Sequence, residues 1–402
     1  MKVHIHLAYG FGKEAWQRRH ASGALIGMND ADPYGYYRAE HMGAQLTSSL
    51  DHAEGRLGYL VRMGFRALLG FDFLHAWRNR GMMSRSEIVW THTESQFLAV
   101  CLTFILSGHA RNERPKIIGQ SVWMMDGWQA LSWPRRQLWR ALIRHVDIMT
   151  FLSPDNLAVA EREFPGIRKE LVLFGINADG GMLPVARAPH DGLKLVAIGN
   201  DIHRDWATLI AAVAPRPDWR LTIVSKTCNP RLADGIGNVT IRVVDNTSDL
   251  LNLYQQADLA IVPLRPNLHA SGITVMLEAA IAGLPMIVSD VGGLKAYFDD
   301  RQVRYVPEGD AGQLREAIAD LAIDRDERMT MAIRAQTRIG PQGLSSESYA
   351  RRHVELSRTL LVKTGVADTV GMSSLAGEPV ATDADNNLSE HTRRHAGSIV
   401  AR

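Results

Sequence analysis

The sequence predicts an α/β protein built from two doubly wound domains that face a central cleft. Two observations lead to this prediction. Short β-branched and apolar runs alternate with longer helical patterns along most of the chain, which is typical of parallel sheets covered by helices. The chain also has 402 residues, which is too long for one ordinary hydrophobic core.

The first alternating set fills the N-terminal half. Its expected strands are residues 3–10, 88–92, 116–123, 147–153 and 170–176, with helical patterns at 94–106 and 134–144. A segment rich in glycine and proline, residues 177–192, then interrupts the pattern. The second set has expected strands at 193–199, 220–225, 239–244, 259–264, 285–290 and 304–307, and expected helices at 204–214, 248–257, 274–282 and 312–323.

These patterns divide the chain into five segments. We expect an N-terminal Rossmann-like domain at 1–180, a linker at 181–192 and a second domain at 193–340. A helix within 341–364 is expected to pack back across the domains. Residues 365–402 are small and polar without Phe, Trp or Tyr, so they are expected to be disordered. Ligands of parallel sheets bind beyond the carboxyl ends of the strands, so the cleft between the domains is the expected site.

The composition excludes several classes of protein. A net charge of +2 argues against a nucleic-acid partner, and the longest apolar run, 97–106, is about half of a membrane span. No signal peptide is visible, so a cytoplasmic location is expected. The two cysteines, Cys101 and Cys228, indicate neither a disulfide framework nor a zinc site. We expect no cofactor and no metal, because Asp30–Asp32 and Asp299–Asp300 are isolated acidic pairs.

Residues 267–293 carry the strongest chemical pattern. The expected buried strand at 259–264 comes just before this segment. It is followed by a loop of small residues and then by a helix that begins near Thr274. The first turn of a helix offers unpaired amides and a positive dipole end, to which a diphosphate is well suited. Glu278, one turn into the helix, is placed to accept hydrogen bonds from a ribose. The donor contacts that we assign to this segment are Asn267, His269, Ser271, Gly272, Ile273, Thr274, Val275 and Glu278.

This segment resembles the C-terminal motif of the family 4 glycosyltransferases, which are retaining enzymes with the two-domain GT-B fold. In that family two glutamates are separated by seven residues, and the second one opens a Glu-Ala-Met-Ala-x-Gly-x-Pro run that leads to a Gly-Gly loop. Glu278 to Pro285 matches this run, and Gly292-Gly293 matches the loop. Ala270 stands at the position of the first glutamate, which the family associates with the hydroxyls of the donor sugar. The resemblance therefore leaves the identity of the sugar open.

A second segment supports the resemblance. The family shows Gly-Arg, a short loop and then Lys-Gly, whose two cations contact the diphosphate. Here Gly199 is followed by Asn200 in place of the arginine, and Arg204 stands at the lysine position. A guanidinium bridges phosphate oxygens well. Lys226, which follows the next strand, is a candidate for the second cation.

In the first domain, His92 follows a strand at the place where GT-B enzymes carry a catalytic or acceptor-positioning histidine. Gly10 and Gly12 form the first-strand loop, which borders the cleft in such enzymes. The resemblance implies metal-independent, retaining transfer of a hexose from a UDP- or GDP-sugar to a saccharide or lipid-linked acceptor. A role in the biosynthesis of bacterial exopolysaccharide or lipopolysaccharide fits such an acceptor. The catalytic residues would be His92, Arg204 and Glu278.

Two other functions remain open. Gly10-Phe11-Gly12-Lys13-Glu14-Ala15 fits a loose dinucleotide fingerprint, which would make the chain an NAD(P)-dependent oxidoreductase. Ala270 also allows a non-catalytic subunit that only binds a nucleotide sugar.

Two basic, aromatic stretches suggest contact with an anionic membrane surface. Residues 134–144 carry Arg135, Arg136, Arg140 and Arg144, and residues 56–80 carry Arg62, Arg66, Arg78 and Arg80 among apolar side chains. Basic amphipathic helices of this kind lie on anionic membranes, which would suit a lipid-linked acceptor.

Overall fold

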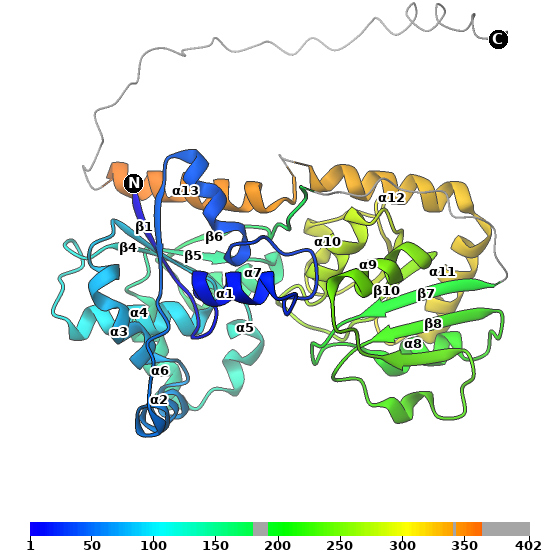
Figure 1. Ribbon diagram of the computed structural model, residues 1–402, viewed down its shortest axis with the longest axis horizontal. Helices are drawn as coiled ribbons and strands as arrows, with labels where there is room; N and C mark the ends of the chain where they lie inside the picture. The colour runs from blue at the N-terminus through cyan, green and yellow to red at the C-terminus, as the bar shows by residue number, and fades with distance from the viewer. Residues whose placement is uncertain (180–191, 341–342, 364–402) are drawn as a thin grey trace, which may run out of the picture.

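A computed structural model describes residues 1–179, 192–340 and 343–363, which form two α/β domains side by side (Figure 1). Each domain is built on a six-stranded sheet in which all paired strands are parallel. The fold class expected from the sequence is confirmed. The expected linker and the expected disordered tail lie almost entirely outside the described residues.

The first sheet has the strand order β2-β1-β3-β4-β5-β6. Its strands are β1 (Lys2–His6), β2 (Gln45–Ser48), β3 (Ile88–Thr91), β4 (Lys116–Ser121), β5 (Ile148–Phe151) and β6 (Arg168–Leu171). The helices of this half are α1 (Lys13–Ala21), η1 (Pro33–Met42), α2 (Arg56–Leu69), α3 (Phe73–Met83), α4 (Glu94–Leu106), α5 (Met124–Gly127), η2 (Trp128–Ala130), α6 (Trp133–Ile143) and α7 (Pro154–Glu163).

The second sheet has the strand order β12-β11-β10-β7-β8-β9. Its strands are β7 (Leu193–Ile198), β8 (Trp219–Val224), β9 (Val239–Arg242), β10 (Leu259–Val262), β11 (Met286–Ser289) and β12 (Arg304–Val306). Its helices are α8 (Trp206–Val213), η3 (Pro230–Ala233), α9 (Thr247–Gln256), α10 (Ile273–Ile281), η4 (Leu294–Ala296), α11 (Ala311–Ile323) and α12 (Arg325–Ile339). The central strands β10 and β11 are wholly buried, which explains their continuous apolar sequences.

The sequence pattern was wrong at the two edges of the first sheet. The edge strand β2, Gln-Leu-Thr-Ser, was not expected, because half of it is exposed and it lacks an apolar run. At the opposite edge, β6 is Arg-Lys-Glu-Leu at 168–171, whereas the sequence predicted a strand at 170–176. An edge strand is covered on fewer sides and carries polar residues, so its hydrophobic signal is weak.

Each sheet reverses its winding direction at one point. In the first sheet this point lies between β1 and β3, and in the second between β7 and β10. Loops that leave neighbouring strands at such a point diverge and open a crevice at the carboxyl edge of the sheet. Residues 199–205 leave β7 and residues 263–272 leave β10, so this point carries both predicted diphosphate segments.

After α12, the chain returns to the first domain as α13 (Ser346–Lys363), shown in orange above the blue and cyan elements of Figure 1. Tyr349 and Val354 of α13 are buried in the core that Tyr36 and Trp90 form on one face of the first sheet. The indole of Trp90 donates a hydrogen bond of 2.9 Å to Ser357 Oγ. The last described helix therefore completes the first domain's core.

None of the helices within the described ranges is both long enough and apolar enough to cross a membrane. Cys101 and Cys228 are buried free thiols.

Candidate functional site

A cavity of about 620 Å³ lies between the two domains. The second domain lines it with the loops after β7, β8 and β10 and with the start of α10, whereas the first domain contributes α1, His92 and the residues around Trp123. Of the residues assigned from the sequence, those that line the cavity are His92, Gly199, Asn200, Arg204, Lys226, His269, Ser271, Gly272, Ile273, Thr274, Val275 and Glu278. Gly10, Gly12 and Asn267 are absent from this lining.

Arg204 is the most unusual cation of the cavity. Only 5% of the residue is exposed, and its Nε and Nη1 atoms have no hydrogen-bond partner among the described residues. The guanidinium lies against Gly199 and Gly272, where an added Cβ would overlap it. Burial lowers the pKa of Arg204 to about 10, so the side chain stays charged at neutral pH. A buried, unpaired charge is costly, and an anion in the cavity would compensate it.

The loop before α10 is held in an unusual conformation. Ala270 and Gly272 have φ angles of 56° and 89°, and Gly272 directly precedes the first helical residue, Ile273. The Asn267 side chain stabilises the loop through two hydrogen bonds to its backbone. Its Oδ1 accepts from Ser271 N at 3.0 Å, and its Nδ2 donates to Arg265 O at 3.0 Å. Asn267 thus shapes the loop and does not face the cavity. The buried Ser271 hydroxyl, which lines the cavity, has no partner among the described residues.

Glu278 lines the cavity but is already engaged on both oxygens. Oε2 accepts from the Tyr254 hydroxyl at 2.9 Å, and Oε1 accepts from the Met28 amide of the first domain at 3.2 Å. Burial raises the pKa of Glu278 to about 7, against the lowering effect of these two hydrogen bonds. Each carboxylate oxygen accepts more than one hydrogen bond, so capacity for a ribose hydroxyl remains.

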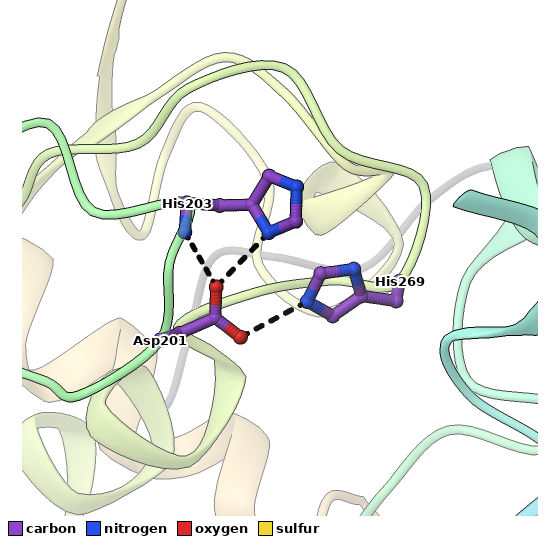
Figure 2. Close-up of side chains that lie close together, drawn as sticks. All are labelled: Asp201, His203 and His269. Atoms are coloured by element: carbon purple, nitrogen blue, oxygen red, sulfur yellow. Dashed lines mark hydrogen bonds and ion pairs between the residues drawn. The ribbon is translucent and has the colours of Figure 1, made fainter. Parts of the chain in front are cut away.

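His269 joins the two domains. Its Nδ1 lies 3.0 Å from Asp126 Oδ2 of α5, and its Nε2 lies 3.2 Å from Asp201 Oδ2 in the loop after β7. Asp126 Oδ1 also accepts from the Leu268 amide at 2.8 Å. Burial alone lowers the pKa of His269, but the two carboxylates raise it to about 9. His203 lies on the other oxygen of Asp201, with its Nδ1 3.0 Å from Oδ1 (Figure 2).

His92 is a neutral imidazole on the first-domain side of the cavity. Burial lowers its pKa to about 3, with a smaller contribution from His353. The ring stacks on Tyr34, with the two centroids 3.5 Å apart. Its Nδ1 lies 3.1 Å from the Tyr36 hydroxyl and 3.4 Å from Gln120 Nε2. These contacts fix the orientation of the ring.

The remaining predicted residues fall into two groups. Asn200 Oδ1 accepts from the Lys226 amide at 2.6 Å, which ties the loops after β7 and β8 together, and the Lys226 side chain is exposed at the cavity. Gly10 and Gly12 lie apart from the lining. The Gly10 amide donates to Asp51 Oδ1 at 2.9 Å, and Gly12 packs against the Ser49 carbonyl. The glycine turn therefore faces the β2 side of the domain.

Sequence reasoning missed several first-domain residues that line the cavity. These are Phe11, Trp16, Arg19, Tyr34 and Trp123. Arg19 adds a second guanidinium, which lies 5.0 Å from the centroid of the Phe11 ring. Trp16 and Arg19 lie on α1, directly after the loop that leaves β1. Ligands of parallel sheets bind beyond the carboxyl ends of the strands, so the start of α1 could have been predicted to line the cavity.

Helix α2 exposes an apolar face. Leu57, Leu60 and Leu68 are 75%, 64% and 72% exposed, and Tyr59, Val61 and Phe65 of the same helix are also exposed. A monomeric protein rarely leaves so many large apolar side chains of one helix in water, so this face indicates an interaction surface.

Most of the arginines in the two basic stretches, residues 56–80 and 134–144, have protein partners. This corrects the expectation of a free basic face. Arg62 and Arg78 both pair with Glu54, and Arg140 pairs with Glu163. Arg135 donates to the Ala67 and Leu68 carbonyls, and Arg136 to those of Gln129 and Leu131. The apolar side chains of α2 are thus the more prominent feature of the surface.

Comparison with solved structures identifies the architecture. The structure superimposes on sucrose-phosphate synthase from Thermosynechococcus elongatus with a TM-score of 0.68 and 18% identity, over 90% of this chain and 100% of that one. It also superimposes on Anabaena HepE in complex with UDP-glucose, with a TM-score of 0.62 and 12% identity over 89% and 100% of the two chains. The fold is that of the GT-B glycosyltransferases, in which two Rossmann-like domains face a central cleft.

Sequence comparison finds a family match within the second domain. Residues 194–324 match the model of the family Glycosyl transferases group 1. The D-inositol 3-phosphate glycosyltransferase of Corynebacterium urealyticum is 31% identical over 113 residues, which are 28% of this chain and 26% of that protein. The matched segment is thus about a quarter of the relative's length. The second domain is thus similar in sequence to the Glycosyl transferases group 1 family, and the whole chain shares the GT-B fold.

Proposed function

We propose that this protein transfers a hexose from a UDP- or GDP-sugar to a saccharide or lipid-linked saccharide, with retention of the anomeric configuration and without a catalytic metal. The observation that carries the proposal is the guanidinium of Arg204, which is buried beside the N-terminus of α10 and whose Nε and Nη1 atoms have no hydrogen-bond partner among the described residues. A diphosphate there would pair with the guanidinium and accept from the first-turn amides. The complex of HepE with UDP-glucose, a protein of the same fold, supports this class of donor.

In such a reaction the cavity residues would have different roles. Arg204, Lys226 and the amides near Thr274 would stabilise the negative charge that builds on the departing diphosphate. Glu278 would hold the ribose through its free lone pairs. Neutral His92, on the first-domain wall of the cavity, would position the acceptor hydroxyl. In this proposal the departing diphosphate itself takes the acceptor proton, on the same face of the sugar.

Donor turnover tests the proposal. A panel of UDP- and GDP-sugars is first screened by thermal shift, and release of the nucleoside diphosphate is then measured. We expect at least one donor to stabilise the protein and to be hydrolysed slowly without an acceptor. Arg204→Ala is expected to reduce this rate by about 100-fold or more, as for loss of one charge-stabilising group. Arg220→Ala, which removes an exposed arginine of β8, is the matched control and should keep the rate.

Three further outcomes separate the alternatives. A donor that binds but is never turned over, with any acceptor, would favour the non-catalytic subunit. Binding of NAD(P)H in preference to nucleotide sugars would favour the oxidoreductase, although Gly10 and Gly12 lie outside the cavity lining. Product with inverted anomeric configuration, measured by NMR, would refute retention.

We further propose that the protein works at the inner, anionic face of a membrane, in surface polysaccharide biosynthesis, and that α2 makes the contact. The exposed apolar face of α2, with the exposed Arg56 and Arg66 beside it, supports this. Flotation with anionic liposomes at low salt should carry the protein upward, and Leu60→Asp with Leu68→Asp should abolish flotation. Ile323→Asp, at an 86% exposed site in the second domain, should leave it unchanged. Absence of flotation at low salt would refute the contact.

A further inference from the structure

Three side chains converge at the edge of the cavity and present nitrogen and oxygen atoms to one another. Asp201 and His203 come from the loop after β7, and His269 comes from the loop after β10 (Figure 2). One ligand atom from each lies within 4.8 Å of the others. The Asp201 carboxylate is central, because it is 3.0 Å from His203 Nδ1 and 3.2 Å from His269 Nε2.

Two of the three separations are close to those of a tetrahedral metal site. With metal–nitrogen and metal–oxygen bonds of about 2.0–2.2 Å, tetrahedral ligand atoms lie about 3.3 Å apart. The two distances from the Asp201 carboxylate, one from each of its oxygens, fall close to this value, and all three ligand atoms lie within 4.8 Å of one another. The rings of His203 and His269 are also near each other, with centroids 4.9 Å apart. Metal binding would require the three groups to rotate toward one point.

A second contact orients the most buried ligand. His269 is 4% exposed, and its Nδ1 hydrogen-bonds Asp126 Oδ2 at 3.0 Å, which leaves Nε2 to face Asp201. A carboxylate behind the far nitrogen of a histidine is the usual support of a metal-bound imidazole, because it fixes the tautomer and the ring orientation. Asp126 is itself fixed by the Leu268 amide.

We propose that Asp201, His203 and His269 form a binding site for a divalent transition-metal ion of the zinc class. Two imidazoles and one carboxylate suit Zn²⁺ and Co²⁺, whereas Mg²⁺ and Ca²⁺ prefer sites made of oxygen alone. Three protein ligands leave one position open, and Asp201 and His269 both line the donor cavity, so that position faces the cavity. The inference goes beyond the proposed transfer reaction and needs no nucleotide. A bound ion would link the two loops, and through Asp126 the first domain.

Metal titration of the full chain, free of affinity tag and stripped with a chelator, tests the site. Isothermal calorimetry with Zn²⁺ should give one ion per chain, and Co²⁺ should produce the visible absorption of a tetrahedral complex. His269→Ala and His203→Ala should each weaken binding at least tenfold and remove the Co²⁺ absorption. Asp126→Asn should weaken binding by about 10- to 100-fold. His41→Ala, which removes an exposed histidine of η1, is the matched control and should bind as the unchanged chain does.

The titration separates this inference from the transfer reaction, because it contains no sugar nucleotide. Circular dichroism of each variant establishes that it is folded, and the partly exposed His203 provides a variant with little effect on packing. Failure of the stripped chain to bind Zn²⁺ would overturn the proposal. Binding that survives both histidine substitutions would also overturn it. Either result would leave the cluster as a set of ion pairs that joins the two domains.

Discussion

At the scale of single residues, we expect the buried charge of Arg204 to lower the stability of the free protein and to favour the binding of a nucleotide diphosphate. Two of the three guanidinium nitrogens of Arg204 are buried with no hydrogen-bond partner in the described parts of the chain, so an apolar side chain of similar length should suit the unliganded site better. We expect Arg204→Met to raise the free energy of unfolding by about 1–3 kcal/mol while nucleotide-diphosphate binding is lost. Urea unfolding and calorimetry measure the two effects.

Arg114 provides the comparison for this prediction. It is 4% exposed but pairs with Asp147 at 2.9 Å. Arg114→Met removes one partner of a buried pair and should cost about 3–5 kcal/mol. A loss of stability in Arg204→Met like that in Arg114→Met would mean that the Arg204 guanidinium has a stabilising partner in the free protein.

Glu278 makes stability depend on pH. Its pKa rises from 4.5 in the unfolded chain to about 7 in the folded one, chiefly through burial. Between these values the folded state holds a proton that the unfolded state releases, so stability falls as pH rises. This decline in the free energy of unfolding amounts to about 3 kcal/mol, and we expect Glu278→Gln to remove it. Urea unfolding of both proteins from pH 4.5 to 8 measures it, and parallel curves would contradict the assignment.

At the scale of elements, the start of α10 depends on a glycine that contacts the guanidinium. Gly272 has a φ angle of 89°, and an added Cβ would lie 2.7 Å from both Arg204 Nη1 and Val262 Cγ1. We expect Gly272→Ala to displace the guanidinium and to weaken nucleotide-diphosphate binding at least tenfold, as calorimetry would measure.

Gly43, which ends η1, provides a control that distinguishes the effect of steric overlap from the effect of backbone strain. Its φ angle is 85°, but no atom lies within 4 Å of an added Cβ. Gly43→Ala should therefore cost about 1–2 kcal/mol of stability through its left-handed backbone alone, and should keep binding intact. Equal binding by the two variants would show that the overlap at Gly272 is unimportant.

At the scale of the whole molecule, one tyrosine makes two of the hydrogen bonds that join the two domains. The Tyr297 hydroxyl of the second domain donates to the Leu152 carbonyl at 2.7 Å and accepts from the Phe174 amide at 3.1 Å. Tyr297→Phe leaves both groups without this partner, so we expect a loss of about 2–4 kcal/mol and a wider spread of domain orientations. Urea unfolding and small-angle X-ray scattering measure these effects.

Tyr305→Phe is the control for the domain contact. That hydroxyl donates at 2.8 Å to the Phe298 carbonyl within the second domain, so its loss should lower stability without changing the scattering. Identical scattering from both variants would mean that Tyr297 does not set the domain orientation.

Local patterns of the sequence were sufficient for much of this molecule. The strands and helices predicted between 193 and 323 lie within two residues of those observed, from β7 to α11. Buried strands such as Leu259–Val262 are continuously apolar, and glycines mark the start and end of α10, so both signals are read from neighbouring residues. The predicted diphosphate segment rests on the same kind of local signal. The polar edges of the first sheet were not.

Contacts between distant residues were decided only by the tertiary structure. Arg204 was predicted as a donor contact, but only the structure shows that its Nε and Nη1 atoms lie buried beside Gly199 and Gly272 with no hydrogen-bond partner among the residues it describes. Asp201 and His269, whose side chains meet, stand 68 positions apart, on loops that only the reversal between β7 and β10 brings together. The sequence alone therefore predicted the fold class and the similarity of the second domain to the group 1 glycosyltransferases. Packing determined which polar groups meet, because hydrogen bonds and ion pairs across a sheet edge leave no periodic signal in the chain.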